Sequence, residues 1–364
     1  MKLVRLATAG FRNLVPAIVD VDAPLVAWWG PNGQGKTNLL ESVAVLGALR
    51  SFRTARLNDV VTIGNEQAAV QCIAESEGCT RRFDWTWSTG GRTLRREERS
   101  VDALTWLSSL RATWFSPADV LLVRGEPALR RGLLDRTVLT VDPAYLGPAR
   151  DLRRVLEHKA ALLRQGGGGD PQLDVLDTQL ARLGAEVSLR RATVVERMRD
   201  AWLRYHDAIA GDEGASGASV RLRSWLGEGD ATVLERRYAE RLGEGRAAER
   251  AAGRILGGPQ RDDLDFRLGG QGARLVASQG QARSLVLAWK LAEVEVARGS
   301  HGEAPLFLMD DLGSELDPAR SEALLAVLRG LGAQVLLTTT DRRFLPAGGA
   351  DALVHRVVAG AVAS

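Results

Sequence analysis

The sequence predicts an α/β fold with a parallel or mixed core sheet, joined to a second part of the chain that is mainly helical. An apolar run at 25–29 leads through a glycine-rich loop into a segment whose leucines recur at helical spacing. A second apolar run at 306–309 ends in two aspartates, and residues 142–210 are charged and periodic. Short continuous apolar runs are typical of strands buried on both faces of a sheet. The core sheet is therefore expected to draw strands from both ends of the chain.

The remaining elements follow the same alternation and helical period. The sequence predicts strands at 3–6, 18–21, 69–74 and 81–87, helices from 36, over 102–110 and over 282–297, and a strand, a helix and a strand between 306 and 337. Residues 142–210 predict a helical hairpin with its turn at the four glycines 166–169, and residues 211–229 predict a loop. The first arm of the hairpin would reach only about 33 Å at the rise of an α-helix. The sequence contains no internal repeat.

Length and composition set the broad class. The 364 residues suffice for two or three domains, or for one large domain with an insertion. With 45% apolar and 26% charged residues, the chain differs from disordered, fibrous and membrane proteins. A formal charge of +3 says little about partners. Neither a secretory signal nor a run of about 20 apolar residues is present, so we expect a cytoplasmic protein with no membrane partner.

Cysteine and lysine are both scarce in this sequence. Two cysteines, Cys72 and Cys79, cannot build a disulfide framework or a four-ligand zinc site, and we expect reduced, buried thiols. Lysine supplies only 4 of the 48 basic residues, so arginine richness is weak evidence for phosphate binding. Each lysine is correspondingly conspicuous. The four are Lys2, Lys36, Lys159 and Lys290.

The loop between the first apolar run and the following helix carries the clearest motif. It fits the pattern G-x-x-x-x-G-K-[ST], in which glycines let backbone N–H groups converge on phosphate oxygens. Lys36 would neutralise the outer phosphates, and the Thr37 hydroxyl would bind Mg²⁺. The motif consists of Gly30, Pro31, Asn32, Gly33, Gln34, Gly35, Lys36 and Thr37, followed by Asn38. A phosphate-binding loop is expected here.

Two adjacent carboxylates end the second apolar run. A P-loop enzyme needs one carboxylate to hold Mg²⁺ through water and another to orient the attacking water. Asp310 suits the first task and Asp311 the second. Asp317 precedes Pro318 and is the predicted N-cap of the next helix, a role compatible with one in nucleotide binding.

A third motif, Ser278-Gln279-Gly280-Gln281, precedes the helix predicted to continue to 297. The order of the P-loop, this serine-led helix start and the double aspartate resembles the ATPase heads of ATP-binding cassette (ABC) proteins. Within that superfamily the chain is similar to the RecF family of bacterial recombinational-repair ATPases, which are related to the SMC and Rad50 heads. The resemblance covers nearly the whole chain and includes the segments 11–14, 30–41, 51–54, 115–119, 130–135 and 258–263.

The resemblance implies an ABC-type head with two lobes. Lobe I would comprise 1–115 and 299–364 with the core sheet. Lobe II would comprise 116–298, with the hairpin at 142–210 and the signature motif at 277–281. The resemblance also assigns Lys36 and Asp311 to catalysis and Thr37 and Asp310 to the metal. The further residues expected at the nucleotide are Arg12, Asn38, Ser278, Gly280, Gln281 and Asp317.

One chain carries two anion-binding helix starts but only one P-loop. If the two starts lie on different lobes, two chains must meet head to tail to close each ATP site. ATP would then hold a homodimer together, and hydrolysis would release it. Asp311 is one methylene shorter than the glutamate common in ABC heads, which predicts slow turnover suited to a switch. The family resemblance implies that this weak ATPase is stimulated by DNA.

The family resemblance further implies binding to double-stranded and gapped DNA and to single-strand to double-strand junctions. The partners it implies are RecR and RecO, and RecA indirectly, at gaps and stalled replication forks. Arginine clusters supply the candidate DNA contacts, which are Arg50, Arg53, Arg56, Arg81 and Arg82.

Two alternatives stay open. A nucleotide-binding subunit of an ABC transporter is disfavoured because Thr338, Thr339 and Thr340 follow the last core strand where transporters place a histidine, and no glutamine lies at 115–119. An SMC-like structural ATPase would need arms far longer than the predicted hairpin. Gln260 stands where the family more often has histidine, and the sequence assigns it no role.

Overall fold

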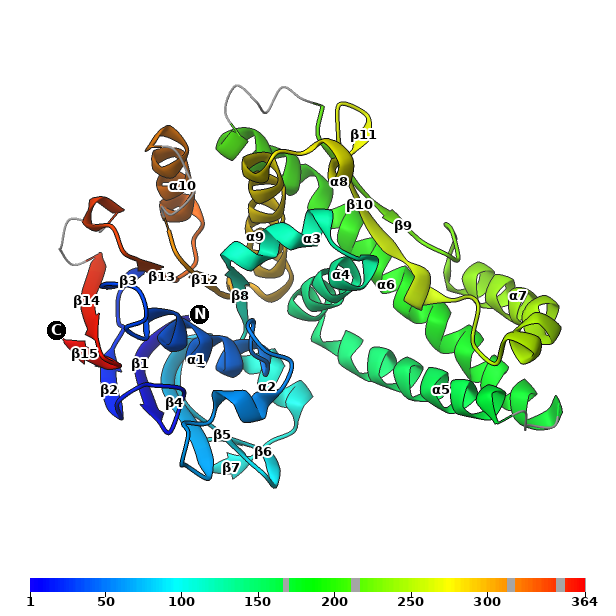
Figure 1. Ribbon diagram of the computed structural model, residues 1–364, viewed down its shortest axis with the longest axis horizontal. Helices are drawn as coiled ribbons and strands as arrows, with labels where there is room; N and C mark the ends of the chain where they lie inside the picture. Colours follow the sequence, from blue (N-terminus) through cyan, green and yellow to red (C-terminus); the bar gives the residue numbers. More distant parts are fainter. Residues whose placement is uncertain (166–169, 211–216, 313–317, 345–350, 364) are drawn as a thin grey trace. The chain divides into compact units, whose positions relative to one another are not determined.

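The computed structural model describes residues 1–165, 170–210, 217–312, 318–344 and 351–363 (Figure 1). The chain divides into two compact units. The first unit consists of Met1–Val120, Ala201–Ser216 and Ala277–Ser364, and the second of Leu121–Asp200 and Gly217–Val276. No helix within the described residues is long and apolar enough to span a membrane.

An antiparallel sheet in the first unit has the strand order β2-β1-β4-β5-β6-β7. Its strands are β1 (Lys2–Ala9), β2 (Ala17–Asp20), β4 (Gln67–Ser76), β5 (Cys79–Ser88), β6 (Gly91–Arg96) and β7 (Arg99–Ser100). Alternate residues such as Val70, Phe83 and Trp85 are buried on one face, as expected for a sheet with one solvated side. The four strands predicted in this region are confirmed.

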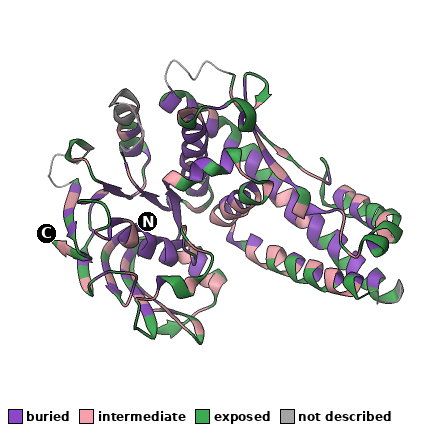
Figure 2. Cartoon of the chain, viewed as in Figure 1, coloured by how far each residue is buried: buried purple, intermediate pink, exposed green. Residues whose placement is uncertain are grey.

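The second sheet of the first unit has the order β15-β14-β3-β13-β12-β8, and all its neighbours are parallel except the pair β14 and β15. Its strands are β3 (Leu25–Trp29), β8 (Ala112–Phe115), β12 (Leu306–Met309), β13 (Val335–Thr339), β14 (Ala352–Val358) and β15 (Ala361–Ala363). The strands β8, β12 and β13 are buried throughout (Figure 2). The predicted sheet with strands from both ends of the chain is confirmed.

Register decides where the loops of this sheet meet. Met309 pairs with Leu337, and Thr339 pairs with Trp29. The carboxyl ends of β3, β12 and β13 therefore share one edge, which is where parallel α/β sheets bind ligands. The P-loop and the double aspartate follow these strand ends directly.

Helices complete the first unit. They are α1 (Lys36–Ala48), α2 (Ala103–Ser109), α9 (Gln279–His301), α10 (Pro318–Gly330), the end of α6 (Asp170–Ala210) and the 3₁₀ turns η1 (Leu57–Val60), η2 (Pro117–Val120) and η6 (Arg342–Phe344). The grouping of α9 differs from the expected lobe boundary, which assigned 277–298 to lobe II. Within the first unit, Trp202 donates a hydrogen bond to the Leu285 carbonyl (3.0 Å) and Thr113 donates one to Glu293 (2.6 Å), so α9 is anchored there.

The second unit is mainly helical, with a small sheet of order β11-β10-β9. Its elements are α3 (Leu121–Arg124), α4 (Pro127–Val141), η3 (Pro143–Tyr145), α5 (Leu146–Arg164), most of α6, β9 (Ser219–Arg223), α7 (Ala231–Ala252), η5 (Pro259–Arg261), β10 (Asp263–Leu268), β11 (Gln271–Gly272) and α8 (Ala273–Val276). The expected hairpin corresponds to α5 and α6, while its glycine turn lies outside the described residues. The loop expected over 211–229 is wrong at 219–223, where β9 pairs with β10.

Two motifs of unassigned role meet inside the second unit. Arg130 forms a bidentate ion pair with Asp263 (2.7 and 2.8 Å), and Arg191 binds Asp262 (2.8 Å) and Asp135 (2.7 Å). Arg191 and Asp262 are buried, so these contacts neutralise charges removed from water. The segments 130–135 and 258–263 therefore stabilise the fold of this unit.

The structure also places the two cysteines and Gln260. Cys72 is buried, and burial raises the pKa of its thiol, but Cys79 is exposed, contrary to the expectation for both thiols. Gln260 donates a hydrogen bond to the Gly257 carbonyl (2.7 Å), which is a local contact of η5.

Candidate nucleotide-binding site

The P-loop links β3 to α1 in a conformation that depends on glycine. Gly30, Gly33 and Gly35 have φ values of +151°, +78° and +107°. A Cβ at Gly30 would lie 2.5 Å from the Val357 carbonyl oxygen, so no side chain fits there. Gly35 is the N-cap of α1 and leaves the first backbone N–H groups of the helix available for an anion.

The Lys36 ammonium lies under this loop. Its Nζ donates hydrogen bonds to the carbonyls of Gly30 and Pro31, both at 2.8 Å, and only 7% of the residue is exposed. Burial lowers the pKa of Lys36, while the negative charges of Asp311 and Asp310 act in the opposite direction. Within the described part of the chain Lys36 forms no ion pair, so the loop holds a buried cation without a carboxylate partner.

A hydroxyl and carboxylate chain joins the P-loop to the double aspartate. Thr37 Oγ1 and Thr338 Oγ1 both donate hydrogen bonds to Asp310 Oδ1, at 2.8 and 2.7 Å. Burial raises the pKa of Asp310, the negative charge of Asp311 adds to the rise, and the two hydroxyls and the positive charge of Arg53 oppose it. The ionised carboxylate of Asp310 is thus disfavoured by its burial, and it lies next to the Thr37 hydroxyl.

These oxygens fit a magnesium ion. Mg²⁺ prefers oxygen ligands and is commonly bound through one or two carboxylates together with phosphates. Asp310 Oδ2 accepts no hydrogen bond from any described residue, and it remains available to a metal-bound water. Across the described ranges, no group of three or more His, Cys, Asp or Glu residues forms a metal-ligand cluster. The chain could therefore supply part of a Mg²⁺–nucleotide site but no complete cage of its own.

Asp311 lies directly after this carboxylate in an unusual backbone conformation. Its φ is +59°, which L-residues other than glycine adopt rarely. Its N–H donates to Thr338 Oγ1 at 2.8 Å, and the N–H of Leu312 donates to the Thr338 carbonyl. Thr338 thus fixes both aspartates, and the sequence had not identified this role.

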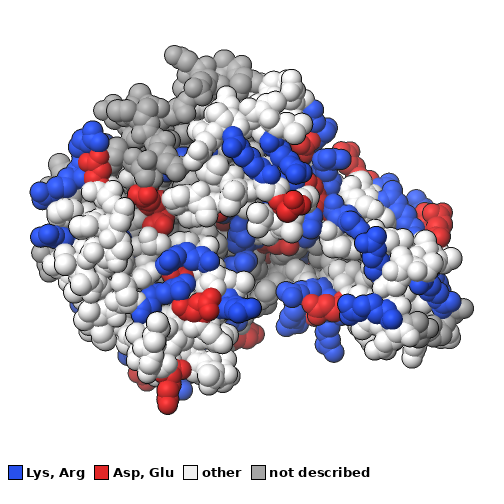
Figure 3. All heavy atoms as spheres, in the orientation of Figure 1, with Lys and Arg blue, Asp and Glu red and all other residues white. Residues whose placement is uncertain are grey.

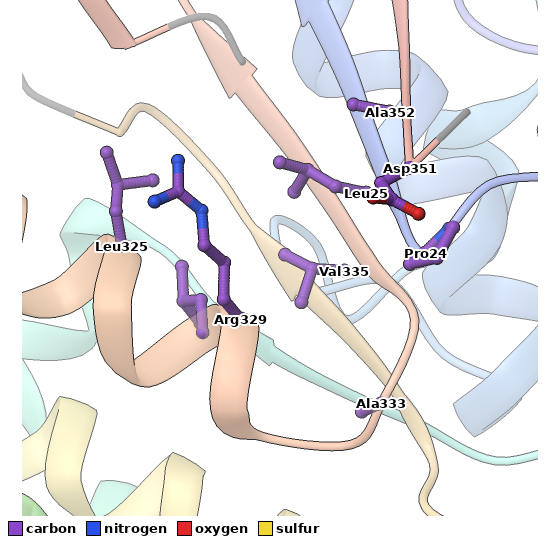
Figure 4. A pocket seen from close by; sticks show the side chains of 9 residues that line it. Pro24, Leu25, Leu325, Arg329, Ala333, Val335, Asp351 and Ala352 are labelled. Atoms are coloured by element: carbon purple, nitrogen blue, oxygen red, sulfur yellow. The ribbon is translucent and has the colours of Figure 1, made fainter. Parts of the chain in front are cut away.

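A pocket of about 440 Å³ opens over the P-loop. Its lining consists of Asn32, Gly33, Gln34, Gly35, Lys36, Thr37, Asn38, Arg53 and Asp310. A second, more apolar cavity of about 430 Å³ lies beside Leu25, Val335 and Ala352, with Leu325 and Arg329 of α10 on its other side (Figure 4). Those three residues begin their strands, so this cavity lies at the opposite end of the sheet from the P-loop.

The C-terminal hairpin braces the P-loop. Gly360 N–H donates to the Gln34 carbonyl (2.9 Å), and Ala359 N–H donates to the Gln34 side chain (2.7 Å). A Cβ at Gly360 would lie 2.0 Å from the Asn13 carbonyl oxygen. The sequence offered no signal for this contact, because it joins positions more than 300 residues apart.

Arg12, expected at the nucleotide, contacts Glu41 and Asp59 in the structure. Its Nε and Nη2 bind both oxygens of Glu41 (3.0 and 2.7 Å), and its Nη1 donates to the Asp59 carbonyl (2.5 Å). Arg53, expected among the DNA contacts, lines the pocket over the P-loop. Glu41 was not identified from the sequence, although it lies in the segment 30–41.

The serine-led motif starts α9 as expected. Ser278 is the N-cap and accepts a hydrogen bond from Gln281 N–H, while the Gln281 side chain accepts one from Ser278 N–H. This capping box occupies Gln281 and leaves Ser278 exposed. Neither residue nor Gly280 lines the P-loop pocket. Asp317 lies outside the described residues.

The remaining candidate DNA contacts are scattered and partly paired. Arg81 lies 3.8 Å from Glu77 and Arg82 lies 3.0 Å from Asp84. Arg50, Arg56 and Arg82 are exposed. Basic side chains are spread over the face shown in Figure 3, with fewer acidic side chains among them. On that face, the distribution of charge does not favour any one of these arginines as a DNA contact.

Known proteins were compared with this chain. No family model matches it. It is 40% identical over 370 residues to the DNA replication and repair protein RecF of Anaeromyxobacter sp. (strain Fw109-5), covering 100% of this chain and 99% of the relative. It is 38% identical over 338 residues to the protein of the same name from Synechococcus sp. (strain JA-3-3Ab), covering 91% and 89%.

Two solved structures support the fold. The recombination mediator protein RecF-ATP in the RecFOR pathway has a TM-score of 0.88 at 24% identity and covers 100% of this chain and 97% of its own. An SMC head bound to the C-winged helix domain of ScpA has a TM-score of 0.57 at 14% identity, over 100% and 96%. The predicted ABC-type head is therefore confirmed.

Proposed function

Because the chain belongs to the RecF family of DNA replication and repair proteins, we propose that it is an ATP-dependent DNA-binding protein of recombinational repair. The observation that carries this proposal is the 2.8 Å hydrogen bond from Thr37 to Asp310, beside a buried lysine that has no carboxylate partner among the described residues. This contact joins two motifs 273 residues apart at the carboxyl edge of one parallel sheet.

The chain's own groups divide the work at this site. The P-loop N–H groups and Lys36 bind the phosphates, and Thr37 and Asp310 hold Mg²⁺ directly and through water. Mg²⁺, when bound, neutralises charge on the outer phosphates. Asp311 orients the attacking water, and its short side chain suits slow turnover. The predicted activity is a weak, DNA-stimulated ATPase.

We propose that a second protomer completes the site, because the start of α9 belongs to the same compact unit as the P-loop but lies outside the lining of its pocket. Ser278 and Gly280 are exposed or half-buried at the start of α9 and lie outside the pocket lining. We assign them, with Asp317, to the ATP held by the P-loop of a partner chain in a head-to-tail homodimer. Nucleotide binding would then close the dimer, and hydrolysis would open it.

The partners follow from the family. The related RecF-ATP structure belongs to the RecFOR pathway. For this chain we propose binding to double-stranded and gapped DNA and to junctions, and assistance to RecR and RecO in loading RecA. A cytoplasmic location fits these partners. Phosphate contacts predict an affinity for DNA that falls steeply with salt.

Sedimentation velocity tests the proposal. The full chain is compared without nucleotide, with Mg²⁺ and a non-hydrolysable ATP analogue, and with ADP, and ATP turnover is measured with and without gapped duplex DNA. We expect a dimer only with the ATP analogue, and faster turnover with DNA. The Ser278→Arg variant should bind the nucleotide as a monomer. A wild-type chain that remains monomeric with the saturating analogue, or whose turnover ignores DNA, would contradict the proposed switch.

A further inference from the structure

A buried carboxylate lies behind the phosphate pocket. Glu41, on the second turn of α1, has no exposed side-chain surface, and its two oxygens accept hydrogen bonds from Arg12, Ser51 and Arg53. An ionised side chain removed from water is costly unless it is paired and hydrogen-bonded. A carboxylate kept here with two arginines therefore calls for a reason beyond packing, since an apolar side chain would fill a helix face at less cost.

The chain returns to Glu41 just after α1 ends. Leu49 has a φ of +54° and reverses the chain, so that residues 51–54 run back along the helix. Ser51 Oγ donates to Glu41 Oε1 (2.5 Å) and accepts hydrogen bonds from the N–H groups of Arg53 (2.9 Å) and Thr54 (3.0 Å). The loop that carries Arg53 is thus attached to the buried carboxylate.

The two arginines differ in the donors that remain available. Arg12 uses its Nε, Nη1 and Nη2 on Glu41 and the Asp59 carbonyl. Arg53 uses only Nη1, on Asn38 Oδ1 (2.6 Å) and, at 3.5 Å, on Glu41 Oε2. Its side chain is 46% exposed and lines the pocket beside Lys36. Its Nε and Nη2 contact no described residue and are available to a phosphate.

We propose that Arg53 is a nucleotide-binding residue and that Glu41 is the positioning residue that holds it at the phosphate pocket, with Arg12 as the fixed counter-cation of Glu41. This inference rests on the proposed function, since it takes the pocket ligand to be a nucleoside triphosphate. The geometry favours this division because Arg12 alone can neutralise Glu41. Arg53 can therefore transfer its charge to a phosphate without leaving a buried carboxylate unpaired.

A double-mutant cycle tests the proposal. Equilibrium binding of a fluorescent ATP analogue with Mg²⁺ is measured for the full chain and for Arg53→Ala, Glu41→Gln and both together. Loss of a charge-assisted contact predicts about tenfold weaker binding for Arg53→Ala. Glu41→Gln should weaken binding about fivefold. The double variant should bind within about twofold of Arg53→Ala, because Glu41 acts only through Arg53. If the fold losses of affinity of the two single variants multiplied in the double variant, the assignment would be overturned. A Glu41→Gln variant that binds the ATP analogue as tightly as wild type would also overturn it.

A second cycle covers the case in which Glu41→Gln fails to fold. Arg12→Ala is introduced into the Arg53→Ala variant, and a change below about twofold is expected. A further large loss would show that Arg12 meets the nucleotide directly and would overturn the division of roles. Ser42→Ala, at the neighbouring buried position of α1, is the matched control and should not alter binding. A wild-type chain that binds no ATP analogue would refute the proposed function instead.

Discussion

Three of the four lysines are buried, and two of them, Lys159 in the second unit and Lys36 in the first, lie in opposite electrostatic surroundings. In the second unit, Lys159 Nζ lies 2.6 Å from both Asp177 and Glu249, and Arg246 binds Asp177 as well. In the first unit, the hydrogen bonds that Lys36 Nζ forms with described residues go to the carbonyl oxygens of Gly30 and Pro31. Both residues are less than 10% exposed. Burial alone therefore does not distinguish their roles.

The partners distinguish them. Two carboxylates neutralise Lys159 in the folded chain. Their ion pairs with Lys159 link α5 to α6 and to α7 within the second unit. Carbonyl dipoles orient the Lys36 ammonium but do not cancel its charge. We therefore propose that Lys36 is a cation kept for an anionic ligand, whereas Lys159 is a structural cation.

The largest effect is expected from Lys159→Met. Removing the ammonium leaves Asp177 and Glu249 buried next to each other, and breaking such a pair from one side costs about 3–5 kcal/mol of folding free energy. Chemical denaturation of the full chain measures the loss. The double change Lys159→Met with Glu249→Leu should recover part of it. A single variant within 1 kcal/mol of wild type would show that the cluster is not the structural element described above.

In contrast to Lys159→Met, Lys36→Met should weaken nucleotide binding strongly and change the folding free energy little. Binding of the ATP analogue is expected to fall at least 100-fold, about 2.7 kcal/mol, because the phosphates lose a charge-assisted contact in a shielded site. The folding free energy should stay within about 1 kcal/mol, since burial already lowers the pKa of this amine and its removal leaves no carboxylate unpaired. Titration calorimetry and chemical denaturation report both quantities. Strong destabilisation would place Lys36 in the same class as Lys159.

The sequence could predict the P-loop and the strand ends because their signals are local. Glycine spacing, the rare Lys36 and the apolar run before Asp310 each lie within a few residues. Parallel pairing of β3, β13 and β12 then forces these segments to one edge, so the contact between Thr37 and Asp310 followed from topology. Scarcity alone had marked Lys36 and Lys159 equally, and only the motif separated them.

What the sequence could not predict depends on contacts across large separations. Thr338 was one of three consecutive threonines, and nothing local selects it as the residue that binds Asp310. The family resemblance placed Arg12 at the nucleotide and Arg53 among the DNA contacts, and nothing local in the sequence showed that both would contact Glu41. The placement of α9 depends on Trp202 and Thr113, which lie far from it in the sequence. The sequence predicted most helices and strands at this site, but it could not predict which side chains contact each other.

Asp311→Asn tests whether the second carboxylate acts on water. The amide should slow ATP turnover by at least about tenfold, because it can orient water but cannot accept its proton. Dimer formation with ATP should persist, since Lys36, Thr37 and Asp310 are unchanged. Turnover is followed by phosphate release and the dimer by sedimentation. A variant that remains monomeric in ATP would assign Asp311 to nucleotide binding rather than to hydrolysis.

The smallest expected effect is that of Asp310→Asn on the folding free energy. It tests whether the buried carboxylate is kept for a metal ion rather than for stability. Because burial raises its pKa, the folded chain releases this proton at higher pH than the unfolded chain, and stability falls as the pH rises between the two pKa values. Near neutral pH the carboxylate thus costs folding free energy, and Asp310→Asn should therefore be more stable than wild type in the absence of Mg²⁺ and ATP. Below the ordinary aspartate pKa the two chains should be equally stable.

Mg²⁺ with the ATP analogue should reverse the order at neutral pH, because only the carboxylate gains from the metal. Thermal unfolding at two pH values, with and without ligand, provides the four measurements. An Asp310→Asn chain that is less stable than wild type without ligand would mean that the hydrogen bonds from Thr37 and Thr338 more than offset the cost of burial. Asp310 would then stabilise the fold as Lys159 does, instead of being held ready for a metal as Lys36 is for phosphate.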